Sequence, residues 1–435
     1  MTLQLPRRRF LALAGAGALG ASSLISACAS QTPKAPSSAT LARLPEPNVL
    51  VIILDTIRYD RFARPAETSL TPNLDRLAAA GIRFDNAWAT SSWSLPAQAS
   101  ILTGHYAHVH GADWPGFGLA KDVPTLAEVL SRRGYATGAF SGNAAWVTPE
   151  YLGRGFLRFD AYTAEDHLRR TVNGRAVSRL LDEVGMHIAG RGKKAPRVNA
   201  EFQKFLNDYP DRPFFAYVCY MDVNQGFHNQ RFNAYFRQQA PTSEVVAAYD
   251  RSLRELDNQV GALLDDLQRR SVLNNTLIVV VSDHGESFGP ALGGDHDPIG
   301  HGTSLYPEQA RVPLFVTFPG RIPAGLSSNR TVSISAIPST VTEVLGYAES
   351  PFPGPSLLGR LQSTTHAMAD DTAILTTLRY GGRELQSVVR ENLQYVRDLS
   401  EASPSEELFD LAADPSASVN RVADHPDLDR MRALA

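Results

Sequence analysis

Cysteine is scarce in this 435-residue chain, which contains only Cys28 and Cys219. Folds that depend on a disulfide framework carry several cysteine pairs in a much shorter chain. The chain must therefore be stabilised by an apolar core, and its hydrophobic content of 43% is sufficient at this length. Because Cys219 lies inside an apolar run, we expect it to be a buried free thiol.

The chain also lacks an excess of charge of either sign. Its formal net charge is -3, and its only basic block is the arginine triplet at residues 7–9. Proteins that bind nucleic acids usually carry a basic patch or stripe. We therefore expect no nucleic-acid partner.

The first 27 residues contain no acidic residue and are typical of a targeting segment. RRRFL at residues 7–11 fits the twin-arginine export pattern. The apolar stretch that follows is rich in Ala and Gly, so it is too weakly hydrophobic for a permanent membrane span. ISAC at residues 25–28 resembles a bacterial lipobox, in which Cys28 is acylated; the alternative is a plain secretory signal. We expect an exported protein, periplasmic or at the cell surface, with a lipid anchor in the membrane.

Composition along the chain suggests four segments. Residues 1–27 form the signal, and residues 28–46, rich in Pro, Ser and Ala, form a flexible tether. Residues 47–362 form a main domain. Residues 363–435 form a small C-terminal subdomain, because short alternating segments there indicate an antiparallel sheet with a terminal helix.

Apolar runs without alternation predict strands that are buried on both faces of a parallel sheet. The runs lie at residues 48–54, 135–141, 214–220, 276–282 and 313–318. Helical patterns lie between them, at about residues 71–81, 125–133 and 243–270. The sequence thus predicts an α/β fold with a large, mainly parallel (mixed) central sheet flanked by helices.

Acidic side chains follow two of these runs. Asp55 comes directly after residues 48–54, and Asp283-His284 follows residues 276–282. Ligands of open α/β sheets bind beyond the carboxyl ends of the strands, and clustered carboxylates call for a cation between them. An Asp after a strand, taken alone, is more often a helix cap than a ligand. Two such sites, one of them followed by His284, lead us to predict a divalent-metal site.

Ser94 lies in the stretch SSWSLPAQASILTG at residues 91–104. Pro96 opens a short predicted helix, so Ser94 would lie near a helix N-terminus, where free amides favour an anion. Ser94 could cap that helix. Beside a metal, its oxygen could instead act as a nucleophile.

Several motifs together resemble the sulfatase family of the alkaline-phosphatase superfamily, in the branch with I-L-D-T-x-R and S-D-H-G-E. They are NVLVIILD, TPNLDRLAAAGIRF, SLPAQASILTGHYAHVHG, SDHGE and ELFDLAADP. The resemblance implies an alkaline-phosphatase-like fold. It places Ser94 where the family has a Cys or Ser that is oxidised to formylglycine. It also implies that Asp55, Asp283 and His284 hold the metal. Hard carboxylates favour Ca²⁺, whereas the imidazole favours a transition metal, so Mn²⁺, Mg²⁺ and Zn²⁺ stay open.

The chain departs from the family pattern at several positions. Thr56 replaces the second Asp of an Asp-Asp pair, and Gln98 replaces the Arg that follows the nucleophile. Asn143 stands in place of a sulfate-gripping Lys element, and Asn224 stands at a His position. We expect Gln98, Asn143 and Asn224 to contact the substrate.

The histidines are further candidates. By resemblance, His301 falls near a family Lys position, and His105 follows the nucleophile helix; both are predicted to contact the substrate or to act as acid or base. His108 and His110 are predicted to be structural, and Glu286 to support the site from outside.

Taken together, these features favour an exported, metal-dependent hydrolase of sulfate esters, which are anionic substrates. Its nucleophile would derive from Ser94, either as formylglycine or as unmodified Ser. Two alternatives stay open. One is a phosphodiester or phosphonate monoester hydrolase, or a phosphoryl transferase, of the same superfamily. The other is a catalytically degenerate lipoprotein that only binds a ligand.

The lipobox generates the first test. In detergent phase partitioning, the mature protein should enter the detergent phase, because an acyl chain on Cys28 adds apolar surface. Cys28→Ala should stay in the aqueous phase, whereas the control Cys219→Ser should still partition with detergent. Equal aqueous partition of wild type and Cys28→Ala would rule out the anchor.

Overall fold

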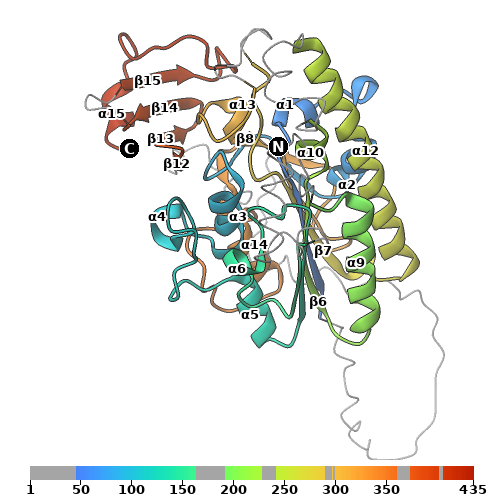
Figure 1. Ribbon diagram of the computed structural model, residues 1–435. Helices are drawn as coiled ribbons and strands as arrows, with labels where there is room; N and C mark the ends of the chain where they lie inside the picture. Colours follow the sequence, from blue (N-terminus) through green and yellow to red (C-terminus); the bar gives the residue numbers. More distant parts are fainter. Residues whose placement is uncertain are drawn as a thin grey trace, which may run out of the picture. The chain divides into compact units, whose positions relative to one another are not determined.

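The central feature of the computed structural model is an eight-stranded sheet (Figure 1). The structure describes residues 46–162, 192–227, 242–289, 296, 299–359, 373–400 and 405–435. The predicted signal and residues 28–45 of the predicted tether lie outside the described residues, as does the predicted boundary near residue 362. Within the described part, no helix is long and apolar enough to cross a membrane.

The strands of this sheet are arranged in the order β10-β2-β9-β7-β1-β6-β4-β5. Their bounds are β1 Asn48–Leu54, β2 Ile82–Phe84, β4 Ala136–Ser141, β5 Arg158–Asp160, β6 Phe214–Tyr220, β7 Thr276–Val281, β9 Leu314–Thr317 and β10 Leu326–Ser328. All neighbouring pairs are parallel except those of β9, which runs antiparallel to both β2 and β7. The prediction of a mainly parallel, mixed sheet is therefore confirmed.

Both faces of the sheet are covered by helices (Figure 1). In β1, Val49, Val51 and Ile53 belong to one apolar cluster, whereas the alternate residues belong to another. The first cluster is completed by α3 Ser94–Thr103, α5 Leu126–Arg132 and α14 Ile337–Val344. The second is completed by α2 Pro72–Ala79, α9 Ala195–Asp208 and α12 Thr242–Arg269. This double coverage explains why β1 lacks alternation in sequence.

Shorter elements connect these layers. The helices are α1 Tyr59–Phe62, α4 Ala107–His110, α6 Pro149–Leu152, α10 Asp222–Phe227 and α13 Pro307–Ala310, with 3₁₀ turns at Ala66–Thr68, Leu273–Asn275 and Ile334–Ala336. A small sheet joins β11 Val332–Ser333, β3 Ala87–Trp88 and β8 Arg311–Val312.

The C-terminal part forms the predicted antiparallel sheet with a terminal helix. Its strands are β12 Ile374–Tyr380, β13 Arg383–Arg390, β14 Leu393–Asp398 and β15 Ser405–Asp410, followed by α15 Leu428–Arg432. The sheet packs on strand β3 of the small three-stranded sheet and on helix α13, because Ile374 and Val389 share an apolar cluster with Trp88 and Ala310.

The turn after β1 is held in an unusual conformation. Thr56 has a φ of 66°, in the left-handed region that a branched side chain rarely occupies. The hydroxyl of Tyr249, on α12, donates to the Thr56 carbonyl at 2.7 Å and accepts from the Arg58 N–H at 2.9 Å. Tyr249 is fully buried, so these bonds clamp the turn that directs the preceding residue, Asp55.

Tyr249→Phe should lower the free energy of unfolding by about 1–3 kcal/mol, because it leaves a buried carbonyl and a buried N–H without this partner. Urea denaturation measures the change. Tyr347→Phe is the matched control, since the Tyr347 hydroxyl has no hydrogen-bond partner among the described residues. Equal stability of the two variants would contradict the role of the clamp.

Candidate active site

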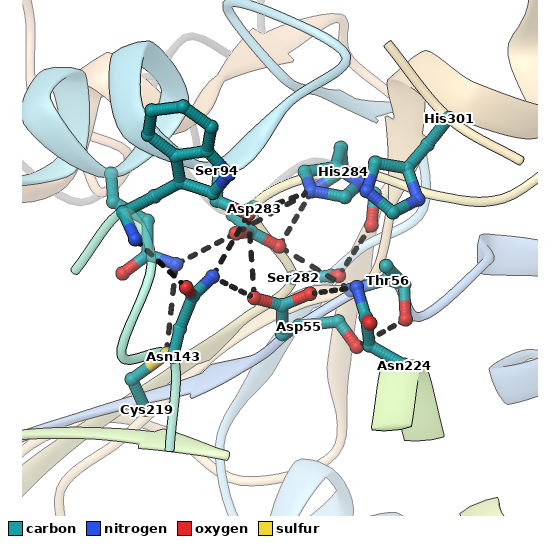
Figure 2. A network of polar contacts seen from close by, with 12 residues as sticks. Asp55, Thr56, Ser94, Asn143, Cys219, Asn224, Ser282, Asp283, His284 and His301 are labelled. Atoms are coloured by element: carbon teal, nitrogen blue, oxygen red, sulfur yellow. Dashed lines mark hydrogen bonds and ion pairs between the residues drawn. The ribbon is translucent and has the colours of Figure 1, made fainter. Parts of the chain in front are cut away.

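The candidate site lies at the carboxyl ends of four adjacent strands (Figure 2). Asp55 follows β1, and Asp283 follows β7 one residue after Ser282. Asn143 follows β4, and Asn224 lies in α10 just after β6. Because β7, β1, β6 and β4 are consecutive neighbours in the sheet, side chains far apart in sequence meet at one edge.

Asp55, Asp283 and His284 form a group that could hold a divalent metal ion. Their ligand atoms all lie within 4.8 Å of one another, and all three residues are fully buried. Among the described residues, no Lys or Arg forms an ion pair with either carboxylate. Burial, reinforced by the negative charge of Asp283, raises the pKa of Asp55 to about 7. A pair of buried carboxylates without a basic partner fits a cation, which would supply the missing positive charge.

The orientation of His284 fits the same role. Its Nδ1 lies 2.9 Å from the carbonyl oxygen of Gly285, which can accept the Nδ1 proton. Nε2 is then unprotonated and faces Ser94 Oγ, at 3.2 Å. A carbonyl that fixes the tautomer of a ligating imidazole is a common arrangement in metal sites.

Ser94 is placed against this group and does not act as a helix cap. Helix α3 begins at Ser94 itself, Trp93 occupies the N-cap position, and no side chain caps the helix. Ser94 Oγ lies 3.4 Å from Asp55 Oδ2 and 3.2 Å from His284 Nε2. The geometry therefore favours the nucleophile interpretation of Ser94 over the capping one.

Asn143 and Asn224 hold Asp55 from both sides. Asn143 Nδ2 donates to Asp55 Oδ2 at 3.0 Å and to Ser94 Oγ at 3.2 Å, and Asn224 Nδ2 donates to Asp55 Oδ1 at 3.1 Å. The backbone N–H groups of residues 145 and 146 donate to Asn143 Oδ1, which fixes the amide orientation. Both residues were predicted to contact the substrate, and the structure gives each a contact with a carboxylate of the site.

Gln98 is also turned toward a carboxylate. Its Nε2 donates to Asp283 Oδ2 at 2.7 Å, and its Oε1 accepts from the Tyr217 hydroxyl at 2.8 Å. Gln98 is fully buried, so the structure places it behind Asp283, where it orients the carboxylate, rather than on a substrate-facing wall. The sequence prediction missed Tyr217. The signal that could have indicated Tyr217 was a tyrosine hydroxyl within the buried strand β6, because a buried hydroxyl needs a hydrogen-bond partner.

His301 lies beside the group, and its role toward the substrate stays a prediction. Its ring lies over that of His284, with centroids 4.4 Å apart, and its Nδ1 is 3.0 Å from Glu286 Oε2 (Figure 2). Glu286 is fully buried. It therefore supports the site from outside the metal group, as the sequence suggested.

His105 is not brought to the site. It follows Gly104 at the far end of α3, and a helix of ten residues places its ends about 15 Å apart. The prediction that His105 contacts the substrate finds no support in this placement. His110 is buried, lies 3.2 Å from Ser100 Oγ through Nε2, and accepts from the Ala112 N–H, so it is structural as predicted.

Cys219 is a buried free thiol, as predicted. It lies behind Gln98, whose Nε2 is 3.6 Å from the sulfur. Burial, together with the nearby carboxylates, raises the pKa of the Cys219 thiol well above its usual value. It therefore stays protonated, and it adds no negative charge to an already acidic site.

Comparison with known proteins agrees with this arrangement. The sulfatase family model matches residues 47–347. Bovine arylsulfatase A is 28% identical over 339 residues, which cover 69% of this chain and 65% of that protein, slightly less than two thirds of its length. Choline-sulfatase of Rhizobium meliloti is 26% identical over 364 residues, which cover 70% of this chain and 68% of that protein.

Solved structures share the fold. The phosphonate monoester hydrolase of Agrobacterium radiobacter superposes with a TM-score of 0.67 at 21% identity, covering 89% of this chain and 94% of that one. A protein solved in complex with its substrate D-glucosamine-2-N,6-O-disulfate superposes with a TM-score of 0.64 at 19% identity, covering 89% and 96%. The family match extends over most of the main domain and includes strands β1 and β7, which Asp55 and Asp283 follow, and helix α3, which begins at Ser94, so the chain belongs to the sulfatase family.

Proposed function

We propose that this protein is a metal-dependent hydrolase of sulfate esters that acts after export, tethered to the membrane through Cys28. The observation that carries the proposal is the position of Ser94. Its hydroxyl lies within 3.4 Å of Asp55 and His284, at the edge of a buried group suited to a cation. Relatives of this chain include arylsulfatase A and choline-sulfatase.

Asp55, Asp283 and His284 would hold the metal ion, with Ser94 beside it. Two carboxylates favour Ca²⁺, although the imidazole leaves room for Mn²⁺, Mg²⁺ or Zn²⁺. When bound, such an ion stabilises negative charge that develops on the ester oxygens. Gln98, Asn143 and Asn224 keep the two carboxylates oriented through neutral amides.

Ser94 Oγ would attack the ester sulfur, so that an O–S bond forms and the S–O bond to the alcohol breaks. Two acceptors lie within reach of the Ser94 hydroxyl proton, Asp55 Oδ2 at 3.4 Å and, in the tautomer described above, His284 Nε2 at 3.2 Å. His301, held by Glu286, would give a proton to the departing alcohol oxygen. These are the roles that the positions of these side chains allow.

The second half of the reaction depends on the state of Ser94. In formylglycine hydrate, the second geminal hydroxyl can expel sulfate and restore the aldehyde. In an unmodified serine, water must attack the sulfur of the covalent ester. Peptide mass analysis distinguishes the two, because oxidation of Ser94 removes two hydrogen atoms.

A second candidate reaction fits the shortage of cations as well as sulfate-ester hydrolysis does, because a sulfate monoester is also singly charged. Gln98, Asn143 and Asn224 are neutral where the family pattern has basic side chains, and a phosphate monoester dianion needs several cations. Singly charged esters need fewer, so phosphodiesters and phosphonate monoesters are the alternative substrates. The fold shared with a phosphonate monoester hydrolase is consistent with this alternative.

Ser94→Ala should reduce kcat/KM at least about a thousandfold on whichever ester the wild type hydrolyses, equivalent to ~4 kcal/mol of barrier. Wild type is first screened on aryl sulfates, phosphodiesters and phosphonate monoesters, and the variant is then assayed on the accepted class. Ser92→Ala is the matched control, because Ser92 is equally buried in the same loop and its Oγ has no partner among the described residues.

If the Ser94→Ala variant keeps more than about a tenth of the wild-type rate, Ser94 is not the nucleophile. A wild type that binds metal but turns over none of the three ester classes would favour a degenerate, ligand-binding member of the family.

Asp283→Asn should lose the stoichiometric metal ion and most of the stabilisation that the ion provides. At a metal concentration about 100-fold above Kd, that stabilisation is about 2.7 kcal/mol. Metal content by mass spectrometry and the Tm with and without chelator measure both effects. Asp424→Asn, on the C-terminal segment, is the control and should behave as wild type. Full metal occupancy in both Asp55→Asn and Asp283→Asn would refute the site.

A further inference from the structure

Beside the candidate site lies a cluster of aromatic rings that the proposed chemistry does not use. We call it the aromatic wall and define it as Trp93, Trp114, Phe117, Trp146 and Tyr380. Trp93 lies 5.0 Å from Tyr380 and 5.2 Å from Trp146 between ring centroids. Trp114 lies 5.3 Å from Phe117 and 5.8 Å from Tyr380. The rings come from four separate segments, yet they form one continuous surface.

Two residues of the aromatic wall, Trp93 and Trp146, lie next to the predicted nucleophile or to a residue that contacts it. Trp93 directly precedes Ser94 and has the extended backbone of an N-cap residue. Asn143, which donates to Ser94, accepts a hydrogen bond from the backbone N–H of Trp146 at 3.0 Å. The backbones of two residues of the wall are therefore fixed relative to the Ser94 hydroxyl.

The aromatic wall also contacts the segment that carries His301. The next residue, Gly302, packs so closely that a Cβ there would lie 3.5 Å from Trp93 Cβ and 3.8 Å from Tyr380 Cδ1. The wall therefore borders the site between Ser94, where the ester would be attacked, and His301, where the alcohol would depart.

The C-terminal sheet holds Tyr380 in this position. Tyr380 is the last residue of β12, and the Thr377 N–H donates to the carbonyl of Thr90 at 3.0 Å. The Thr376 hydroxyl donates to the carbonyl of Ala89 at 2.8 Å. Because residues 89 and 90 lead directly to Ser94, these bonds fix Tyr380 relative to the nucleophile.

The wall has both an open end and a buried donor. Trp114 is 41% exposed, so a ligand can reach its ring from solvent. Trp93 is 3% exposed, and its indole N–H has no acceptor among the described residues. A buried donor without an acceptor costs free energy, and an oxygen of a bound ester would supply the acceptor.

We propose that the aromatic wall binds the alcohol portion of the substrate, and that this portion is an aromatic or similarly flat apolar group. The proposal rests on the proposed function, because it assumes that the anion of the same ester lies at Ser94. Flat rings stack on or pack edge to face against indole and phenyl rings, which are the contacts that the wall already makes internally. The indole N–H of Trp93 would donate to an ester oxygen.

Binding to a Ser94→Ala background tests the wall without turnover. The ligands are four sulfate esters: 2-naphthyl sulfate, ethyl sulfate, glucose 6-sulfate and choline sulfate. The methylphosphonate esters of the same four alcohols are also measured, so that the result does not depend on the choice of anion. We expect the naphthyl ester to bind more tightly than the other three. Adding Trp114→Ala should weaken naphthyl binding about threefold to tenfold, as expected for the loss of an aromatic pair, and leave ethyl sulfate unchanged.

Two further variants serve as controls, one for unfolding of the protein and one for the removal of an exposed apolar side chain elsewhere on its surface. Trp114→Phe keeps a ring and should retain most of the naphthyl preference. Leu157→Ala removes an exposed apolar side chain outside the wall, 54% exposed, and should change nothing. Tighter binding of the sugar or choline ester, or a naphthyl affinity that is indifferent to Trp114→Ala, would overturn the proposal.

The outcome is separable from that of the proposed function. If wild type hydrolyses none of the esters while naphthyl binding still depends on Trp114, the proposed hydrolysis fails and the wall stands. If wild type hydrolyses both the ethyl and the naphthyl ester, and Trp114→Ala leaves the ratio of their kcat/KM values unchanged, the wall fails and the hydrolysis stands.

Discussion

The structure of the site depends on two fully buried carboxylates, Asp55 and Asp283, that face one another at the ends of adjacent strands. Burial of such a pair is unfavourable unless positive charge or hydrogen bonds compensate. Among the described residues, that compensation comes from neutral amide donors and backbone N–H groups, not from Lys or Arg. A divalent ion held by this group would complete the charge balance, and the surrounding amides would then orient its ligands.

Gln98 illustrates this constraint. An arginine at its position would bring a full positive charge close to Asp283. The amide of Gln98 instead holds Asp283 Oδ2 without charge, and the Tyr217 hydroxyl fixes the amide from behind. The loss of a family feature in the sequence therefore coincides with a complete hydrogen-bonded chain in the structure.

The small C-terminal sheet contributes to the site although it carries none of the predicted ligands. Its strand β12 is tied to the segment that leads into α3, and it presents Tyr380 beside Trp93. The main domain thus supplies the polar centre. The C-terminal sheet places Tyr380 beside this centre, and under the proposal for the aromatic wall it would contribute to selectivity.

The sequence by itself determined the α/β class, the buried strands and the candidate metal group, because each of these depends on local signals. An apolar run such as residues 48–54 predicts a doubly buried strand, and Asp55 must then emerge at its carboxyl end. Only the tertiary structure decided the second set of contacts. The approach of Tyr249 and Tyr217, the inward turn of Gln98 and the separation of His105 from Ser94 depend on which elements pack together and on helix length. No local pattern encodes these, since each joins segments that are distant in the chain or lie at opposite ends of one helix.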